Sequence, residues 1–135
     1  FGQARVVREG TDCTLASWGR PVLFCLEAAN ELQKLGISCE VIDLRTVRPL
    51  DIGTVVQSVK KTSTCVVVDQ SWSFGSPGSE LASQVHRHCF DDLDNYVHRV
   101  HSADVPTPYA EQLEQAYLPN ARRIIEAVKS ATYNL

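Results

Sequence analysis

Short apolar runs alternate along the chain with segments whose apolar residues recur every three or four positions. The runs over residues 4–8, 14–17, 37–44, 65–68 and 96–100 predict β-strands. The run 65–68 is the most apolar of them, which predicts a central strand buried on both faces. Alternation of strands with helices is typical of an α/β fold with a mainly parallel sheet.

The helical segments carry start and stop signals. Pro21 opens the first helix, because proline is favoured at the first helical position, and Gly36 ends it. Asp51 is expected to cap a second helix and Asn120 the last one. The predicted apolar faces are Val22, Leu26, Ala29 and Leu32, then Ile52, Val55, Val56 and Val59, then Leu81, Ala82, Val85 and Cys89, and finally Ala121, Ile124, Ile125 and Val128.

Composition describes an ordinary globular chain. The 135 residues suit one domain, 1–135, and the apolar and charged fractions of 44% and 21% exclude a disordered protein. The net charge of -3 gives no electrostatic reason to expect nucleic acid or an anionic membrane as partner. No apolar run approaches the roughly 20 residues of a membrane helix, and no signal peptide is visible. Because the chain starts at Phe1 without a Met, we expect its natural N-terminus to lie upstream.

The five cysteines are widely spaced and contain no CxxC pair. Their odd number favours reduced thiols in a compartment like the cytosol or the mitochondrial matrix. Cys39 and Cys65 lie inside apolar runs, so we expect both in the core.

Polar residues at two strand ends are the first candidates for chemistry. Asp43 and Asp69 follow predicted parallel strands, where ligands of open α/β sheets bind. They form either an acid/base pair or local turn caps, and we favour caps because the adjacent loops supply no nucleophile or metal-ligand set. The loop with Gly75 and Gly78 fits neither GxGxxG nor a P-loop, which indicates a tight strand-to-helix turn.

The histidines do not assemble a metal site in the sequence. His86 and His88 point to different sides of a predicted helix, and His86 with Cys89 gives only two ligands. His98 and His101 flank a strand end on opposite faces, so all four histidines are expected at the surface or in an interface.

Two loops have the character of interfaces. Trp72 and Phe74 on one loop either anchor a partner or cover the sheet edge locally, and the two interpretations are equally supported. Arg45 and Arg48, just after a strand, either bind an anion or form interdomain ion pairs. For arginine, a structural or interface ion pair is the usual outcome. The residues alone therefore predict an α/β domain without an assembled active site.

Two segments resemble a known family. Cys39-Glu-Val-Ile-Asp-Leu-Arg-Thr-Val-Arg-Pro-Leu-Asp51 is similar to the central signature of transketolase C-terminal domains. Ala103-Asp-Val-Pro-Thr-Pro-Tyr-Ala110 resembles beta subunits of the pyruvate-type thiamine-diphosphate-dependent 2-oxoacid dehydrogenases, and residues 25–29 and 72–80 agree. The first signature is shared with the branched-chain enzyme, whereas the second favours the pyruvate enzyme. The similarity continues in register to Leu135.

The resemblance implies a three-layer αβα domain with a mixed, mostly parallel five-stranded sheet. It implies an α2β2 heterotetramer, made with alpha subunits and a second beta subunit, that decarboxylates pyruvate oxidatively. Thiamine diphosphate and magnesium would then bind between the alpha subunit and the N-terminal domain of beta. The Gly-Asp-Gly motif that holds them is absent from this chain, which is expected to bind no cofactor and to be inactive alone.

The resemblance also assigns contact residues. Asp94 and the carboxylate of Leu135 match the positions that dock the peripheral subunit-binding domain of the dihydrolipoamide acetyltransferase. Without the resemblance, Asp94 is a solvated member of the acidic stretch 91–94. The compartment implied is the mitochondrial matrix or, alternatively, a bacterial cytoplasm. The residues expected at subunit or interdomain interfaces are Arg45, Arg48, Trp72, Phe74, Asp104, Pro106 and Tyr109.

Departures and alternatives remain. Asn95-Tyr96 stands where the family has Ala-Pro, Ser102 where Gly is common, and Gln70-Ser71 where a Gly pair is usual, which affects loop conformation and the partner surface. The nearest alternative is a branched-chain beta subunit. A free-standing receiver-like or flavodoxin-like module is disfavoured, because a receiver needs carboxylates after its early strands and residues 14–19 offer none.

Overall fold

A five-stranded sheet is the centre of the fold. The computed structural model describes residues 2–103, 110, 112 and 118–132. The strand order is β1-β3-β2-β4-β5, with β1 antiparallel to β3 and the other three pairings parallel. The prediction of a mixed, mostly parallel sheet is confirmed. The strands are β1 (Arg5–Arg8), β2 (Cys13–Ser17), β3 (Cys39–Asp43), β4 (Cys65–Trp72) and β5 (His98–Ser102).

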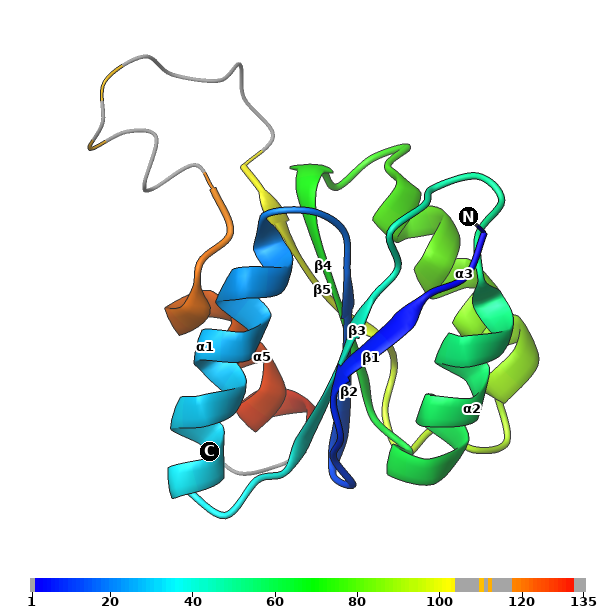
Figure 1. The fold of residues 1–135 in the computed structure, drawn as a ribbon, viewed down its shortest axis with the longest axis horizontal. Helices are drawn as coiled ribbons and strands as arrows, with labels where there is room; N and C mark the ends of the chain where they lie inside the picture. The colour runs from blue at the N-terminus through cyan, green and yellow to red at the C-terminus, as the bar shows by residue number, and fades with distance from the viewer. Residues whose placement is uncertain (1, 104–109, 111, 113–117, 133–135) are drawn as a thin grey trace.

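Helices cover both faces of this sheet, which gives the three αβα layers seen in Figure 1. Helices α1 (Pro21–Lys34) and α5 (Ala121–Ala131) pack together on one face, and α2 (Ile52–Thr62) and α3 (Pro77–Cys89) pack together on the other. None of the described helices is long and apolar enough to cross a bilayer.

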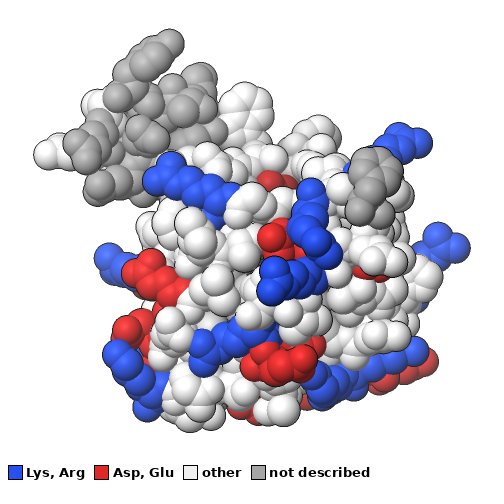
Figure 2. Space-filling view, in the orientation of Figure 1, with Lys and Arg blue, Asp and Glu red and all other residues white. Residues whose placement is uncertain are grey.

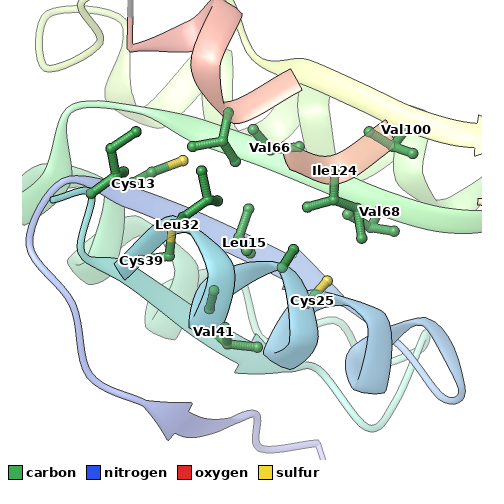
Figure 3. Close-up of a cluster of buried hydrophobic side chains, with 14 of the residues drawn as sticks. Cys13, Leu15, Cys25, Leu32, Cys39, Val41, Val66, Val68, Val100 and Ile124 are labelled. Carbon is green, nitrogen blue, oxygen red and sulfur yellow. The ribbon is translucent and has the colours of Figure 1, made fainter. Parts of the chain in front are cut away.

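Alternate residues of the central strands face opposite layers and build two cores. Leu15, Val41 and Val66 face α1 and α5, where they meet Leu32 and Ile124 (Figure 3). The second core, between the sheet and the other two helices, contains Ala16, Ile42, Val67, Val59 and Leu81.

All five cysteines are buried free thiols, which confirms the expectation for Cys39 and Cys65. Burial raises the pKa of both Cys25 and Cys65 to about 12. These two thiols therefore stay protonated at neutral pH and act as small apolar side chains.

The predicted helix caps are present. Asp51 accepts a hydrogen bond from the Thr54 backbone N–H at 3.2 Å, and Asn120 accepts one from the Arg123 N–H at 3.0 Å. Asp51 also accepts from the Ala4 N–H at 2.8 Å, so the cap of α2 fastens the segment leading into β1 as well.

Four local predictions were wrong. Trp72 ends β4 and is not in a loop, because the strand resumes its pairing with β5 after an irregularity, opposite Ser102. The last strand begins at His98 and not at Tyr96, and His98 is buried and not at the surface. Gly78 belongs to the first turn of α3, packed against Asp69, so the preceding turn is shorter than expected.

Candidate functional site

Four of the predicted contact residues lie along one edge of the sheet. The carboxyl ends of β2, β3 and β4 meet at the upper edge in Figure 1, and ligands of open α/β sheets bind beyond such ends. Arg45 and Arg48 follow β3, whereas Trp72 ends β4 and Phe74 follows it. Both arginines are exposed, as are Trp72 (46%) and Phe74 (93%). The other predicted contact residues, Asp104, Pro106 and Tyr109, lie outside the described residues.

A groove of about 460 Å³ opens at this edge, between the segment after β3 and the start of α3. Trp18 forms part of its wall and donates a hydrogen bond from Nε1 to the Thr46 carbonyl at 3.0 Å, which holds the segment 45–50 in place. We call it the Trp18 groove. Its described lining is Trp18, Val47, Arg48, Leu50, Pro77, Glu80 and Gln84.

The aspartates at the strand ends organise the backbone. Asp43 accepts a hydrogen bond from the Arg45 N–H at 3.0 Å. Asp69 accepts from the Ser71 N–H at 2.9 Å and from the Gly78 N–H at 2.8 Å, which joins the end of β4 to the first turn of α3. The interpretation as local caps is confirmed, and these carboxylates shape the edge on which the contact residues stand.

Asp94 lies at the opposite, amino edge of the sheet. It is exposed, and its backbone N–H donates to the Ser63 carbonyl at 2.9 Å. It borders a hollow of about 340 Å³ whose described lining contains the carboxylates of Asp12 and Asp94 and no Lys or Arg. Thr132, just after α5, lines the same hollow, whereas Leu135 lies outside the described residues.

A buried imidazole, one of whose ring nitrogens has no hydrogen-bond partner among the described residues, lies in the edge strand β5. His98 is 8% exposed and stacks on Tyr96, with ring centroids 4.1 Å apart. Its Nε2 has no hydrogen-bond partner among the described residues, and burial lowers the pKa of His98, which favours the neutral ring. His86 accepts a hydrogen bond from the Val97 N–H at 3.1 Å. The part of the chain that is described contains no group of three or more His, Cys, Asp or Glu able to hold a metal ion.

A buried carboxylate next to β1 is a feature that sequence reasoning missed. The Glu40 side chain is 3% exposed and pairs with Lys61 Nζ, which also lies 3.5 Å from the carboxylate of the exposed Glu9. The Gly10 N–H donates to Glu40 at 3.3 Å. A Cβ on Gly10 would lie 2.2 Å from the Cys39 carbonyl carbon, so only glycine permits this close approach. The ion pair therefore fastens the turn after β1 to β3 and α2.

Opposing effects act on the pKa of Glu40. Burial alone raises the pKa, whereas hydrogen bonds from Lys61, Ser58 and the Gly10 N–H lower it by more. The pKa of Glu40 consequently lies below its ordinary value, and the carboxylate stabilises the folded chain while it is ionised.

Charge over the rest of the visible surface is mixed. In the view of Figure 2, Lys and Arg side chains are interspersed with Asp and Glu. Partner recognition on this face therefore depends on local contacts and not on a large field of one sign.

Comparison with known proteins identifies the domain. Residues 2–124 match the family model described as "Transketolase, C-terminal domain". The chain belongs to the transketolase C-terminal domain family. The transketolase C-terminal domain described here is also 29% identical to a solved structure titled "Split gene transketolase, inactive beta4 tetramer", with a TM-score of 0.80 over 98% of this chain and 42% of that one. This confirms the predicted fold class.

Curated relatives share more of the sequence. The chain is 46% identical over 133 residues to "Pyruvate dehydrogenase E1 component subunit beta" of Rickettsia felis. It is 45% identical over 132 residues to "Pyruvate dehydrogenase E1 component subunit beta, mitochondrial" of Dictyostelium discoideum. Both matches cover 98% of this transketolase C-terminal domain, but only 41% and 37% of the relatives. The chain therefore spans about two fifths of the length of these relatives.

The Glu40 ion pair generates a pH prediction for this transketolase C-terminal domain. Glu40→Gln should lower the free energy of unfolding by about 1–3 kcal/mol at pH 7, because it removes the buried negative charge that pairs with Lys61 and accepts from Ser58 and the Gly10 N–H. Since the folded-state pKa is depressed, this difference is fully present above the ordinary Glu pKa of about 4.3 and shrinks as pH falls through the folded-state value. Denaturant unfolding between pH 3 and 7 measures it.

Glu9→Gln is the matched control, because Glu9 contacts the same lysine from a side chain that is 85% exposed. It should change the free energy of unfolding by no more than about 0.5 kcal/mol at any pH. A pH-independent difference for Glu40→Gln, or equal effects of the two substitutions, would contradict the assignment.

Proposed function

We propose that this chain is the C-terminal domain of the beta subunit of the pyruvate dehydrogenase E1 component, which decarboxylates pyruvate oxidatively and passes the acetyl group to a lipoyl group. The similarity to subunits of that name over 98% of the chain carries the proposal. Because the chain spans 41% of the Rickettsia relative, the activity belongs to the complete assembly. Membership of the transketolase C-terminal family removes the support for a free-standing receiver-like or flavodoxin-like module.

Catalysis in this proposal depends on the rest of the enzyme. Thiamine diphosphate with magnesium supplies the decarboxylation chemistry, but the residues of this chain do not fit that cofactor. The sequence has no Gly-Asp-Gly motif, and the carboxylates of Asp43 in β3 and Asp69 in β4 accept hydrogen bonds from backbone N–H groups. The domain would instead position the subunits that hold the cofactor.

The first structural task is subunit assembly at the carboxyl edge, in an α2β2 heterotetramer. Exposed Phe74 and Trp72 share this edge with the exposed Arg45 and Arg48, and aromatic and arginine side chains are enriched at protein interfaces. The solved relative's title describes a beta4 tetramer, which supports direct association between beta subunits.

The second task is docking of the dihydrolipoamide acetyltransferase through its peripheral subunit-binding domain. The exposed Asp94 borders a hollow with Asp12, and the described lining of this hollow carries no Lys or Arg, so it suits a basic partner. We also propose Leu135 as a docking residue; in the sequence it lies three positions after Thr132, another lining residue.

The compartment follows from the organism. Relatives from Dictyostelium discoideum and Caenorhabditis elegans are named mitochondrial, whereas others come from bacteria such as Rickettsia felis. We propose the mitochondrial matrix for this chain, with the bacterial cytoplasm as the alternative.

Because the proposed function assigns the cofactor to the rest of the enzyme, we predict that the isolated chain does not bind it. Titration of the 135-residue chain with thiamine diphosphate and magnesium should give no binding heat in a calorimeter, because the proposed function assigns the diphosphate and magnesium ligands to other domains and this chain has no Gly-Asp-Gly motif. Tight, magnesium-dependent binding would show that this chain itself holds the cofactor.

The docking assignment predicts the effect of Asp94→Ala. Affinity for the peripheral subunit-binding domain should fall by roughly 30-fold or more, the usual cost of removing one partner of a buried charge pair. Surface plasmon resonance on the α2β2 enzyme measures the affinity, and thermal unfolding should change little.

Asp91→Ala is the control, since Asp91 is an exposed carboxylate of the same acidic stretch. Equal losses for the two variants would indicate a general effect of negative charge. Preferential binding to the subunit-binding domain of a branched-chain complex would instead support the branched-chain enzyme.

A further inference from the structure

An exposed aromatic side chain, Phe74, and the Trp18 groove lie on the same edge of the sheet. Phe74 is 93% exposed in the turn between β4 and α3, so its ring makes little contact with its own chain. The Trp18 groove borders the start of the same helix, where Pro77 lines it. Trp18, Val47 and Leu50 complete its apolar wall, and Val47 is itself 52% exposed.

The rim of the groove carries two opposite charges. Arg48 and Glu80 line it, and neither forms an ion pair with any residue that the structure describes. Glu80 only accepts a hydrogen bond from Gln84, at 2.9 Å. The edge therefore presents an apolar groove, an exposed aromatic ring and two charges of opposite sign that form no ion pair with the described residues.

A patch that carries an exposed ring, an apolar groove and charges of both signs has the elements needed to pair with a second copy of itself. A two-fold axis brings the same patch of two subunits together. If one residue of the first copy contacts a second residue of the other copy, the reverse contact forms as well. An aromatic side chain that fills an apolar pocket is the usual source of binding energy at an interface, and charges at the rim set orientation.

We propose that the Trp18 groove receives Phe74 of a second copy of this chain, with Arg48 of each copy facing Glu80 of the other. The contact rests on the proposed function, because it specifies how two beta subunits meet inside the assembly. The proposed occupant of the groove is a second beta subunit. Binding of the alpha subunit to the same groove is the alternative that the test distinguishes.

The first test removes the Phe74 side chain in the full-length beta subunit. Phe74→Ala should raise the dissociation constant of beta–beta association by about ten-fold or more, as for a central aromatic anchor. Analytical ultracentrifugation of the beta subunit alone measures it. Phe90→Ala is the matched control, since Phe90 is 78% exposed just after the end of α3, away from this edge, and should change the constant less than about two-fold.

The second test exchanges the charges. Arg48→Glu and Glu80→Arg should each weaken association, because each places like charges opposite one another across the axis. A mixture of the two variants restores two attractive pairs, so association should return in the mixture and in the double variant Arg48→Glu/Glu80→Arg. Circular dichroism of each variant establishes that the fold is retained.

The outcomes separate this inference from the proposed function. Beta–beta association that is unchanged in Phe74→Ala, or that the mixture does not recover, overturns the two-fold contact. If these variants instead lose the alpha subunit in a pull-down while beta–beta association persists, the groove belongs to the alpha subunit and the proposed function stands. Failure of the unmodified subunit to assemble with any pyruvate dehydrogenase alpha subunit would overturn the proposed function itself.

Discussion

Parallel pairing of β2 with both β3 and β4 is the constraint on which the rest of the structure depends. Backbone hydrogen bonds of a fully buried strand have no access to water, so each must be made within the sheet. Once the three central strands are parallel, their connections have to return over the faces as helices, which builds the two cores. The same pairing sends all their carboxyl ends to one edge and their amino ends to the other.

Two functional edges follow from this topology. The exposed aromatic and arginine side chains lie where β3 and β4 end, whereas Asp94 lies at the opposite edge, four residues before β5 begins. The two proposed contacts, subunit assembly and acyltransferase docking, therefore use opposite edges of the sheet and do not compete for one surface. The ion pair between the buried Glu40 and the exposed Lys61, together with the close approach of Gly10, fastens the turn after the antiparallel strand β1, which forms one edge of the sheet.

Local signals in the sequence predicted local structure. Pro21, Asp51 and Asn120 begin or cap their helices as expected, because capping depends on residues only three positions apart. The limits of β4 and β5 were missed, since pairing opposite Ser102 and stacking against His98 decide them. Contacts distant in sequence were also invisible: Glu40 and Lys61 are 21 positions apart, and the Trp18 groove joins three separate segments. Its lining residues have no shared motif or spacing that could have indicated it.

The most direct measurement is affinity purification of the full-length subunit from its own cells, read by mass spectrometry, with the tag kept away from Leu135, a proposed docking residue. If the domain serves pyruvate dehydrogenase, the subunit brings down a pyruvate-type alpha subunit together with a dihydrolipoamide acetyltransferase. Recovery of branched-chain partners would retain the domain's role but contradict the substrate. Recovery of neither an alpha subunit nor an acyltransferase would contradict the assembly and docking functions together.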